Sequence, residues 1–354
     1  MKKAETNVSV ALVGINGYGH LYLDYLLDHG QELTAELVGV IDPDASRSER
    51  FEELEKAGIP AFNSLEEFYK DNSAELVIIS APIQYHLPFS REAVNHGSNV
   101  LCEKPLAATA EEAWAFKQLE EQSSQFIAVG YQWSFSTPIQ NLKKDIVNGD
   151  LGSPVRFRTL CLWPRPQSYY DRNNWAGCVK TENGSWVLDS PANNATAHFL
   201  HNMLYLQGNE TTKSTLPVTV DADLYRAKNI ENYDSAAVHV KTDIETDIFF
   251  YTTHTVGEKR GPIFHLEFEN ADVYYDKDKD AVIRARFRDG SEKSYGNPEE
   301  NNLQKLEDAV SAVRGEKSIV CGVEAAMAQT LCIHKMQMES TIQPIPSQYI
   351  QCEE

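Results

Sequence analysis

The stretch that decides the fold is residues 8–19, with the sequence VSVALVGINGYG. Its first half is apolar and predicts a short buried strand, and the glycines that follow lead into an amphipathic segment, residues 20–29, which predicts a helix. The same rhythm continues to about residue 130, as apolar strand-like runs alternate with charged helix-like runs. Such alternation is typical of an α/β domain with a doubly wound parallel sheet.

The rhythm changes after residue 130. One helical segment, residues 137–152, leads into strand-like runs that alternate along the chain and are broken by Gly, Asn and Pro. These runs predict a half-exposed, open antiparallel sheet, and two helices are expected at residues 302–314 and 323–339. We therefore predict an α/β domain over residues 1–130 and an α+β domain over residues 131–354.

Composition narrows the class of protein. The chain has 354 residues, which exceeds a single hydrophobic core, and 42% of them are hydrophobic, as in ordinary globular proteins. A formal charge of -20 argues against nucleic acid and membrane surfaces as partners. Six scattered cysteines form no C-x-x-C pair, so a metal site is not expected. With no signal-like or membrane-spanning segment apparent, a cytoplasmic location is expected.

The glycine loop that follows the first strand has the position of a dinucleotide-binding turn. Gly14 allows a tight turn and Gly19 allows the helix to approach the strand, while backbone amides at the helix start can hold a pyrophosphate. By itself the pattern fits a structural turn equally well. The loop residues expected to contact a cofactor are Gly14, Asn16, Gly17, Tyr18 and Gly19.

Asp42 strengthens the interpretation of the loop as a cofactor site. It ends the second predicted strand, 23 residues after Gly19, where a carboxylate can accept hydrogen bonds from a ribose. The carboxylate would repel a 2'-phosphate, so NAD is expected, although Ser46 and Arg47 keep NADP possible.

Two later strand ends carry further polar residues. APIQYHLP contains Pro82, which shapes a turn, and His86, which either contacts the cofactor or is an ordinary loop histidine. CEKP contains Glu103 and Lys104, and a lysine there could polarise or protonate a substrate oxygen. A salt-bridged lysine at a strand end is the equal alternative.

These motifs resemble the glucose-fructose oxidoreductase and inositol dehydrogenase family, also called Gfo/Idh/MocA. The resemblance rests on the glycine loop, Asp42, APIQYH, CEKPLAAT, GYQ at Tyr131 and GDLG at residues 149–152. It implies a Rossmann domain that binds NAD(P) and a second domain whose sheet often forms the oligomer interface, here as a homodimer or homotetramer. It also assigns Lys104 to contact with both cofactor and substrate.

The family has a helix motif of the form D-x-x-x-H-x-x-D, and residues 194–201 match it with substitutions. His198 takes the place of the histidine, while Asn194 and His201 stand where aspartates are expected. Asp189 lies nearby but does not fit the spacing. The resemblance implies that His198 is a general base oriented by Asn194. Without it, the two histidines would be interpreted as core residues.

Residues 163–177 form an aromatic and amide-rich segment that suits a sugar ring and its hydroxyls. The family commonly lines its substrate pocket from this segment, although packing beneath a loop explains each residue equally well. The residues expected to contact substrate are Tyr131, Trp163, Arg165, Tyr170, Trp175 and His201.

The sequence thus predicts an oxidoreductase that transfers a hydride between NAD(P) and a carbinol carbon of a sugar, cyclitol or sugar derivative. Lys104, His198 and Asn194 are the predicted catalytic residues. Two alternatives are an NAD-dependent glycosidase-type enzyme of the same family and a non-catalytic, NAD-binding regulator.

Overall fold

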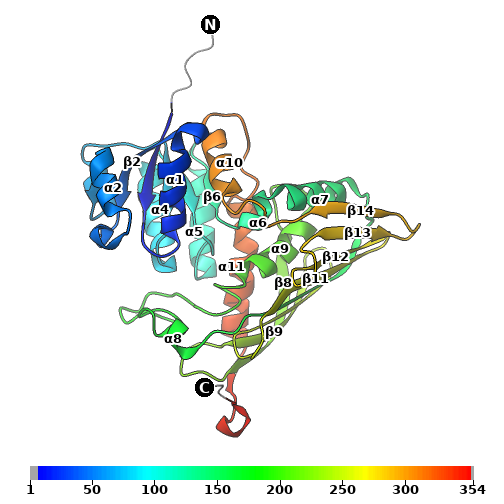
Figure 1. The fold of residues 1–354 in the computed structure, drawn as a ribbon. Helices are drawn as coiled ribbons and strands as arrows, with labels where there is room; N and C mark the ends of the chain where they lie inside the picture. Colours follow the sequence, from blue (N-terminus) through cyan, green and yellow to red (C-terminus); the bar gives the residue numbers. More distant parts are fainter. Residues whose placement is uncertain (1–6, 352–354) are drawn as a thin grey trace.

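The structure, a computed structural model, describes residues 7–351 and is built around two sheets (Figure 1). The first sheet has the strand order β3-β2-β1-β4-β5-β6, and every neighbouring pair is parallel. This confirms the predicted doubly wound sheet. Its strands are β1 Val8–Val13, β2 Ala35–Ile41, β3 Ala61–Phe62, β4 Leu76–Ile79, β5 Asn99–Cys102 and β6 Ile127–Val129.

The helices of this half connect successive strands. The strand order reverses beside β1, which has β2 on one side and β4 on the other, and ligands bind at such a point in open α/β sheets. The helices are α1 Gly19–Leu33, η1 Ala45–Arg47, α2 Phe51–Ala57, α3 Leu65–Tyr69, η2 Ile83–Tyr85, α4 His86–Asn95 and α5 Ala110–Glu121.

The second sheet has nine strands in the order β14-β13-β12-β11-β7-β10-β9-β8-β15. The predicted open sheet is present, but it is mixed, because β7 pairs in parallel with β10 and β8 with β15. The remaining pairs are antiparallel. Its strands are β7 Pro154–Leu162, β8 Pro217–Arg226, β9 Ser235–Thr242, β10 Asp247–Thr253, β11 Arg260–Phe268, β12 Ala271–Asp276, β13 Ile283–Phe287, β14 Glu292–Gly296 and β15 Ile342–Pro344.

One face of this sheet is covered by helices and the other is open. α9 packs on β7 and α11 packs on β8, so the inward side chains of the strands are buried while the outward ones are half-buried or exposed. The helices of this half are α6 Gln132–Phe135, α7 Thr137–Asn148, α8 Gln167–Tyr170, α9 Ala197–Gln207, α10 Gln304–Val313, α11 Val323–Glu339 and η3 Ser347–Tyr349.

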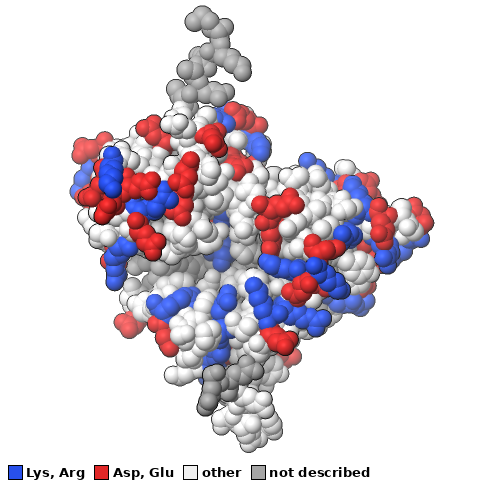
Figure 2. All heavy atoms as spheres, viewed as in Figure 1, with Lys and Arg blue, Asp and Glu red and all other residues white. Residues whose placement is uncertain are grey.

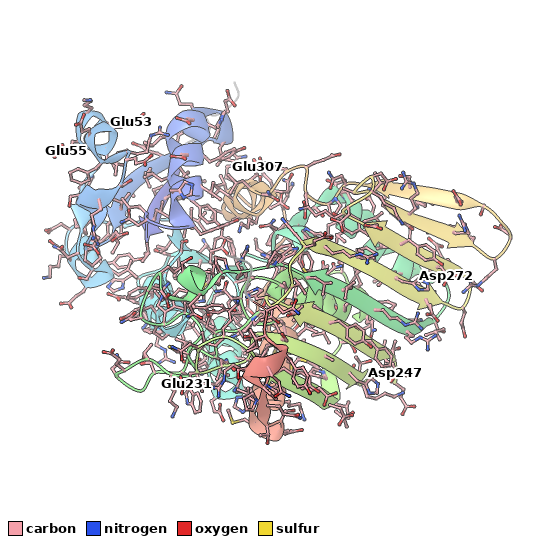
Figure 3. The ribbon with its side chains drawn as sticks, turned by 60° about the horizontal axis from the view of Figure 1, so that its bottom comes forward. Glu53, Glu55, Glu231, Asp247, Asp272 and Glu307 are labelled. Carbon is pink, nitrogen blue, oxygen red and sulfur yellow. The ribbon has the colours of Figure 1, made fainter. Side chains whose placement is uncertain are left out.

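The last two long helices return to the first sheet. α11 packs against α5, and α10 packs against α1, β4 and β5. Glu307 on α10, labelled in Figure 3, accepts a hydrogen bond from the hydroxyl of Tyr25 on α1 at 2.7 Å. The two halves are therefore joined by these helices as well as by the chain after β6. The boundary at residue 130 stays a prediction.

Charge is spread over the surface in both signs (Figure 2). Acidic side chains gather over α1 and α2, and there Arg50 binds Asp24, Asp28 and Glu53. None of the helices within residues 7–351 is long and apolar enough to cross a membrane.

Candidate active site

A cavity of about 560 Å³ lies where the parallel strands end, between the glycine loop and the segment before α9. It combines residues from the first sheet with residues from the second half of the chain. Its walls are formed by Asn16, Gly17, Tyr18, Ser80, Ala81, Pro82, Ile83, His86, Glu103, Lys104, Pro105, Tyr169, Arg172, Asn173, Trp175, Val187, Asp189, Asn193 and Asn194.

The glycine loop is shaped by close backbone contacts. Gly14 has φ of +77°, and a Cβ there would lie 2.3 Å from the carbonyl oxygen of Ser80. A Cβ on Gly19 would lie 1.8 Å from the carbonyl oxygen of Gly14, so no larger side chain fits at either position. Both glycines therefore shape the loop from behind the cavity wall, while Asn16, Gly17 and Tyr18 line the cavity itself.

Asp42 holds this loop from the end of β2. Its Oδ2 accepts hydrogen bonds from the backbone N–H of Ile15 at 3.0 Å and from Nδ2 of Asn16 at 3.1 Å. Its Oδ1 accepts from the N–H of Asp44 at 2.9 Å and keeps a second lone pair. The carboxylate therefore braces the loop and retains an acceptor for a ribose hydroxyl.

His86 joins two turns of the cavity wall. The imidazole is buried, with Nδ1 2.8 Å from the carbonyl oxygen of Pro105 and Nε2 2.9 Å from that of Ala81. These carbonyls belong to the CEKP turn and to the turn that contains Pro82. The structure thus shows His86 fixing the wall, with both ring nitrogens directed at backbone.

Glu103 forms a buried ion pair with Lys305 of α10. The side chain of Lys305 is 0% exposed and donates to Glu103 Oε1, while the hydroxyl of Tyr22 donates to the same oxygen at 2.6 Å. Burial alone would raise the pKa of Glu103, but Lys305 and Tyr22 outweigh it and hold the pKa below its usual value. Gly130 makes room for this carboxylate, since a Cβ there would lie 2.7 Å from Oε1.

Lys104 points across the cavity to Asn194. Its Nζ donates to the backbone oxygen of Asn194 at 2.9 Å and to the side-chain Oδ1 at 3.2 Å. Burial and the charge of Lys305 lower the pKa of Lys104, and Glu103 and Asp189 oppose this only in part. One ammonium hydrogen is left for a ligand in the cavity.

Asp189 completes this contact from behind Asn194. Nδ2 of Asn194 donates to Asp189 Oδ1 at 2.7 Å, and the backbone N–H of Gly177 donates to Asp189 Oδ2 at 2.6 Å. Burial raises the pKa of Asp189, and the two N–H donors reduce that effect. The site therefore has a carboxylate close to Asn194, although not at position 194 itself.

His198 lies on the first turn of α9, outside the cavity walls. Its Nδ1 is buried without a hydrogen-bond partner among the described residues, and its ring meets Tyr131 edge to face at 5.8 Å between centroids. Burial, followed by the charges of Lys104 and Lys305, holds the pKa of His198 well below its usual value. The imidazole is therefore neutral at neutral pH, as expected without a carboxylate at position 194.

His201 and Tyr131 lie in the core behind the cavity. The His201 ring is stacked on Tyr131 at 3.8 Å, and its Nε2 is 2.8 Å from the hydroxyl of Ser134. The hydroxyl of Tyr131 donates to Gln329 at 2.9 Å, deep within the molecule. Neither residue belongs to the cavity walls, so the structure does not bring them to the predicted substrate site.

The aromatic segment divides between cavity and core. Trp175 lines the cavity, whereas Tyr170 is buried with its hydroxyl 2.7 Å from Nδ1 of His254. Trp163 donates through Nε1 to the carbonyl oxygen of Gly261 at 2.9 Å, and Arg165 packs near the Trp163 ring. Trp163, Arg165 and Tyr170 support the segment without forming the described wall.

Two charged residues of the site, Asp189 and Lys305, are not predicted from the sequence. Spacing alone sets Asp189 aside, although a single acid between apolar residues and a Ser-Pro turn is a signal of a buried polar role. Lys305 lies more than 200 residues from Glu103 and looks like any helix-surface lysine, so no local signal identifies it. Arg172 also lines the cavity, with its guanidinium 3.7 Å from the centre of the Tyr169 ring.

The cavity fits a dinucleotide at the end formed by the glycine loop. Gly17, with φ of +65° and open space within 4 Å of a Cβ position, leaves room beside the start of α1, where backbone N–H groups favour a phosphate. Asn16, Gly17 and Tyr18 would hold the pyrophosphate and Asp42 the ribose. Within residues 7–351 no cluster of His, Cys, Asp or Glu is arranged to bind a metal ion.

Comparison with known proteins identifies this half of the molecule. Residues 8–131 match the family model GFO_IDH_MocA, described as "Oxidoreductase family, NAD-binding Rossmann fold". Over residues 8–131 the chain is thus similar to the Gfo/Idh/MocA family. This match agrees with the resemblance seen in the sequence, and its description names NAD as the cofactor class.

Two curated relatives each match less than half of the chain. An inositol 2-dehydrogenase of Corynebacterium glutamicum is 28% identical over 155 residues, which are 44% of this chain and 45% of the relative. A glucose-6-phosphate 3-dehydrogenase of Bacillus subtilis is 29% identical over 146 residues, 41% of each chain. The alignments thus span less than half the length of these relatives.

Solved structures extend the likeness to the second domain. The WlbA dehydrogenase of Chromobacterium violaceum, solved in complex with NADH and UDP-GlcNAcA, has a TM-score of 0.75 and 19% identity and covers 95% of both chains. At this identity the likeness establishes the fold. The fold is therefore shared with this structure over nearly the whole length of the chain.

Proposed function

We propose that the chain is an NAD(P)-dependent oxidoreductase that transfers a hydride between nicotinamide and a carbinol carbon of a sugar, cyclitol or sugar derivative. The observation that carries the proposal is Lys104, whose ammonium lies in one cavity with the glycine loop and has one hydrogen free for a substrate oxygen. The names of the relatives, inositol 2-dehydrogenase and glucose-6-phosphate 3-dehydrogenase, support this substrate class.

The residues of the cavity have distinct roles in this proposal. Lys104 donates a hydrogen bond to the reacting oxygen and stabilises negative charge there as the carbinol loses its proton. The bound nicotinamide supplies the hydride acceptor. Trp175, Tyr169 and Asn173 offer aromatic faces and an amide to a ring with hydroxyls. His198 lies outside the cavity walls at the start of α9, where the charge of Lys104 still acts on it, and its neutral imidazole stays the predicted base.

Asp42 supports a preference for NAD over NADP. Its carboxylate already accepts hydrogen bonds from the glycine loop and keeps one acceptor for a ribose hydroxyl, whereas a 2'-phosphate would meet a negative charge. We expect kcat/KM to be higher with NAD+ than with NADP+.

The experiment is a panel of cyclitols, sugars and sugar derivatives assayed with NAD+ and NADP+ for absorbance of the reduced cofactor. Lys104→Ala is expected to lose turnover by at least ~100-fold, since an electrostatic donor in a closed site is worth about 3 kcal/mol, while it still binds NADH. The matched control is Lys70→Ala, an exposed lysine of the same domain, which should equal wild type. Unchanged turnover in Lys104→Ala would contradict the proposal.

We infer that the open face of the second sheet joins copies of the chain into a homodimer or homotetramer. Tyr251 and Tyr274 are exposed on outward positions of β10 and β12, amid half-buried neighbours. Two acids of this sheet, Asp247 and Asp272, are labelled in Figure 3. Each is paired within the chain, Asp247 with His239 and Asp272 with Arg288.

Sedimentation of wild type and Tyr251→Arg tests this oligomer. Introducing a charge on the face should shift the protein toward monomer, whereas Tyr349→Arg, a change at an exposed tyrosine outside this sheet, should not. A Tyr251→Arg protein with the wild-type mass would exclude this face.

A further inference from the structure

Three residues form one line of hydrogen bonds into the cavity. Nζ of Lys104 donates to Oδ1 of Asn194 at 3.2 Å, and Nδ2 of Asn194 donates to Oδ1 of Asp189 at 2.7 Å. The far oxygen of Asp189 accepts from the N–H of Gly177 at 2.6 Å. Asp189 is only 5% exposed, so this carboxylate is held by the protein rather than by water.

The line has a fixed direction. An ionised carboxylate accepts hydrogen bonds and donates none, so the amide of Asn194 must direct its NH2 group at Asp189. The amide oxygen is then left facing Lys104, which is a donor. An amide reversed by 180° would place NH2 against the ammonium and an oxygen against the carboxylate, losing both bonds and adding two repulsions.

We propose that Asp189 is a positioning residue that locks the amide of Asn194 with its oxygen toward Lys104 and so directs the remaining hydrogen of Lys104 into the cavity. The inference rests on the proposed function and adds to it a residue outside the helix motif. It also explains how a chain with asparagine at position 194 keeps a carboxylate for its lysine, five residues upstream.

The charge of Asp189 acts in the same direction as its geometry. A carboxylate near an ammonium favours the charged form, and Asp189 raises the pKa of Lys104 against the lowering effect of burial. The other charged or titratable groups that face this region are Glu103, Lys305, Arg172, His86, His198, Tyr18, Tyr169, Tyr170, Cys178 and Tyr233.

A single substitution reverses the lock. In Asp189→Asn, the amide oxygen at position 189 still accepts from the N–H of Gly177, so the NH2 group at position 189 faces Asn194. The amide of Asn194 must then turn its own oxygen toward that NH2 group and away from Lys104. Lys104 then loses an acceptor and a nearby negative charge together. Its pKa should fall by at least ~1 unit, the lower end of the shift that a neighbouring carboxylate produces.

The exchanged pair, Asp189→Asn with Asn194→Asp, restores the line of hydrogen bonds and moves the negative charge from position 189 to position 194. The amide oxygen at position 189 accepts from the N–H of Gly177, and the NH2 group at the same position donates to the carboxylate at position 194. That carboxylate in turn accepts from Lys104, so every hydrogen bond of the wild type has a counterpart. The pKa of Lys104 should therefore rise above the wild-type value, and turnover should return with its pH optimum moved upward.

The pKa of Lys104 is measured without substrate by competitive labelling with acetic anhydride over a pH series, followed by mass spectrometry of the peptide that contains it. Asp171→Asn, an exposed acid of the same segment, is the matched control. Turnover is measured in parallel on the sugar and cyclitol panel. If wild type reduces no cofactor in that panel, the proposed function fails, while the labelling still tests the lock.

The pKa of Lys104 should be highest in the exchanged pair, intermediate in wild type and lowest in Asp189→Asn. The kcat of Asp189→Asn should be reduced at least ~10-fold, and the exchanged pair should recover it. A pKa of Lys104 in Asp189→Asn equal to that of wild type would overturn the proposal. So would an exchanged pair whose pKa stays as low as that of the single variant. If Asp189→Asn does not fold, a folded exchanged pair with the raised pKa supports the proposal, and an unfolded one contradicts it.

Discussion

Two buried carboxylates near Lys104 differ in their partners. Glu103 is paired with the ammonium of Lys305, which is itself fully buried, so this side of Lys104 carries little net charge. Asp189 is satisfied only by N–H groups and keeps its negative charge. The field at Lys104 therefore depends on the Lys305 pair remaining intact.

Removing Lys305 should expose that dependence. Lys305→Gln leaves Glu103 buried without its cation, and breaking a buried pair in this way costs about 3–5 kcal/mol of unfolding free energy. Urea unfolding measures the loss. Lys317→Gln, which removes an exposed partner of Asp308, should cost no more than about 1 kcal/mol. Equal losses in the two variants would show that the buried pair adds no stability.

The same pair predicts a pH window. The pKa of Glu103 is lowered in the folded state, so its contribution is present above the unfolded value and is lost as pH falls through the folded value. The pKa of Lys305 is raised, so its contribution is present below its unfolded value and is lost as pH rises through the folded one. The pair therefore contributes fully to wild-type stability near neutrality and loses that contribution at both extremes. In Lys305→Gln, burial raises the pKa of Glu103 without an opposing cation, so the wild-type advantage over the variant should shrink as pH falls below neutrality. An advantage that stays constant between about pH 8 and pH 4 would contradict this.

At the scale of elements, the end of α9 depends on one buried lysine from α7. The ammonium of Lys143 is fully buried and donates to the backbone oxygens of Tyr205, Gly208 and Lys213, where the helix has run out of its own donors. α9 carries His198 at its other end. A change at Lys143 therefore acts on the site through the position of a helix.

Lys143→Met should destabilise the protein strongly. It fills similar space but leaves the backbone oxygens of Gly208 and Lys213 without this donor, at about 1–3 kcal/mol each, while the oxygen of Tyr205 keeps the N–H of Gly208. We expect the unfolding free energy to fall by about 3 kcal/mol or more, measured by urea titration. Lys144→Met, at the exposed neighbouring position on α7, is the control and should change it by less than about 0.5 kcal/mol. Similar values for the two variants would mean that water satisfies these carbonyls.

The elements that the sequence predicts are those with a clear period. β7, β9, β10, β11 and β12 alternate inward and outward residues, and the structure has strands at these places. β8 escapes prediction, because its outward positions carry acids and it begins at Pro217. β3 and β15 are too short to show a period. Their pairing is decided by neighbours far along the chain.

At the scale of the whole molecule, the cavity is assembled from segments that no local pattern connects. The glycine loop and the CEKP turn meet because parallel strands end at one edge, which the sequence predicts. The contacts of Asp189 with Asn194 and of Lys305 with Glu103 need the loop before α9 and the helix α10 to return to that edge. Such tertiary contacts depend on the packing of both sheets together, so spacing alone misjudges Asp189.

Buried histidines should set the acid stability of the whole molecule. Burial lowers the pKa of His201 and of His254 to about 3. A histidine in the unfolded chain has a pKa of about 6.5, well above the pKa of these two residues in the folded protein. The unfolded state is therefore favoured as pH falls from the unfolded pKa toward the folded one. Stability is therefore fully present above about pH 6.5, and each histidine should remove about 2 kcal/mol of it between pH 6.5 and pH 5.

His254→Gln isolates one of these contributions. The variant loses stability at neutral pH through the broken contact with Tyr170, but its unfolding free energy should fall by about 2 kcal/mol less than that of wild type between pH 7 and pH 5. The difference in slope is informative because every other titrating group is common to both proteins. His29→Gln, at a half-exposed histidine of α1, should keep the wild-type slope. Parallel pH curves for His254→Gln and wild type would show that His254 becomes protonated in the folded protein as readily as in the unfolded chain.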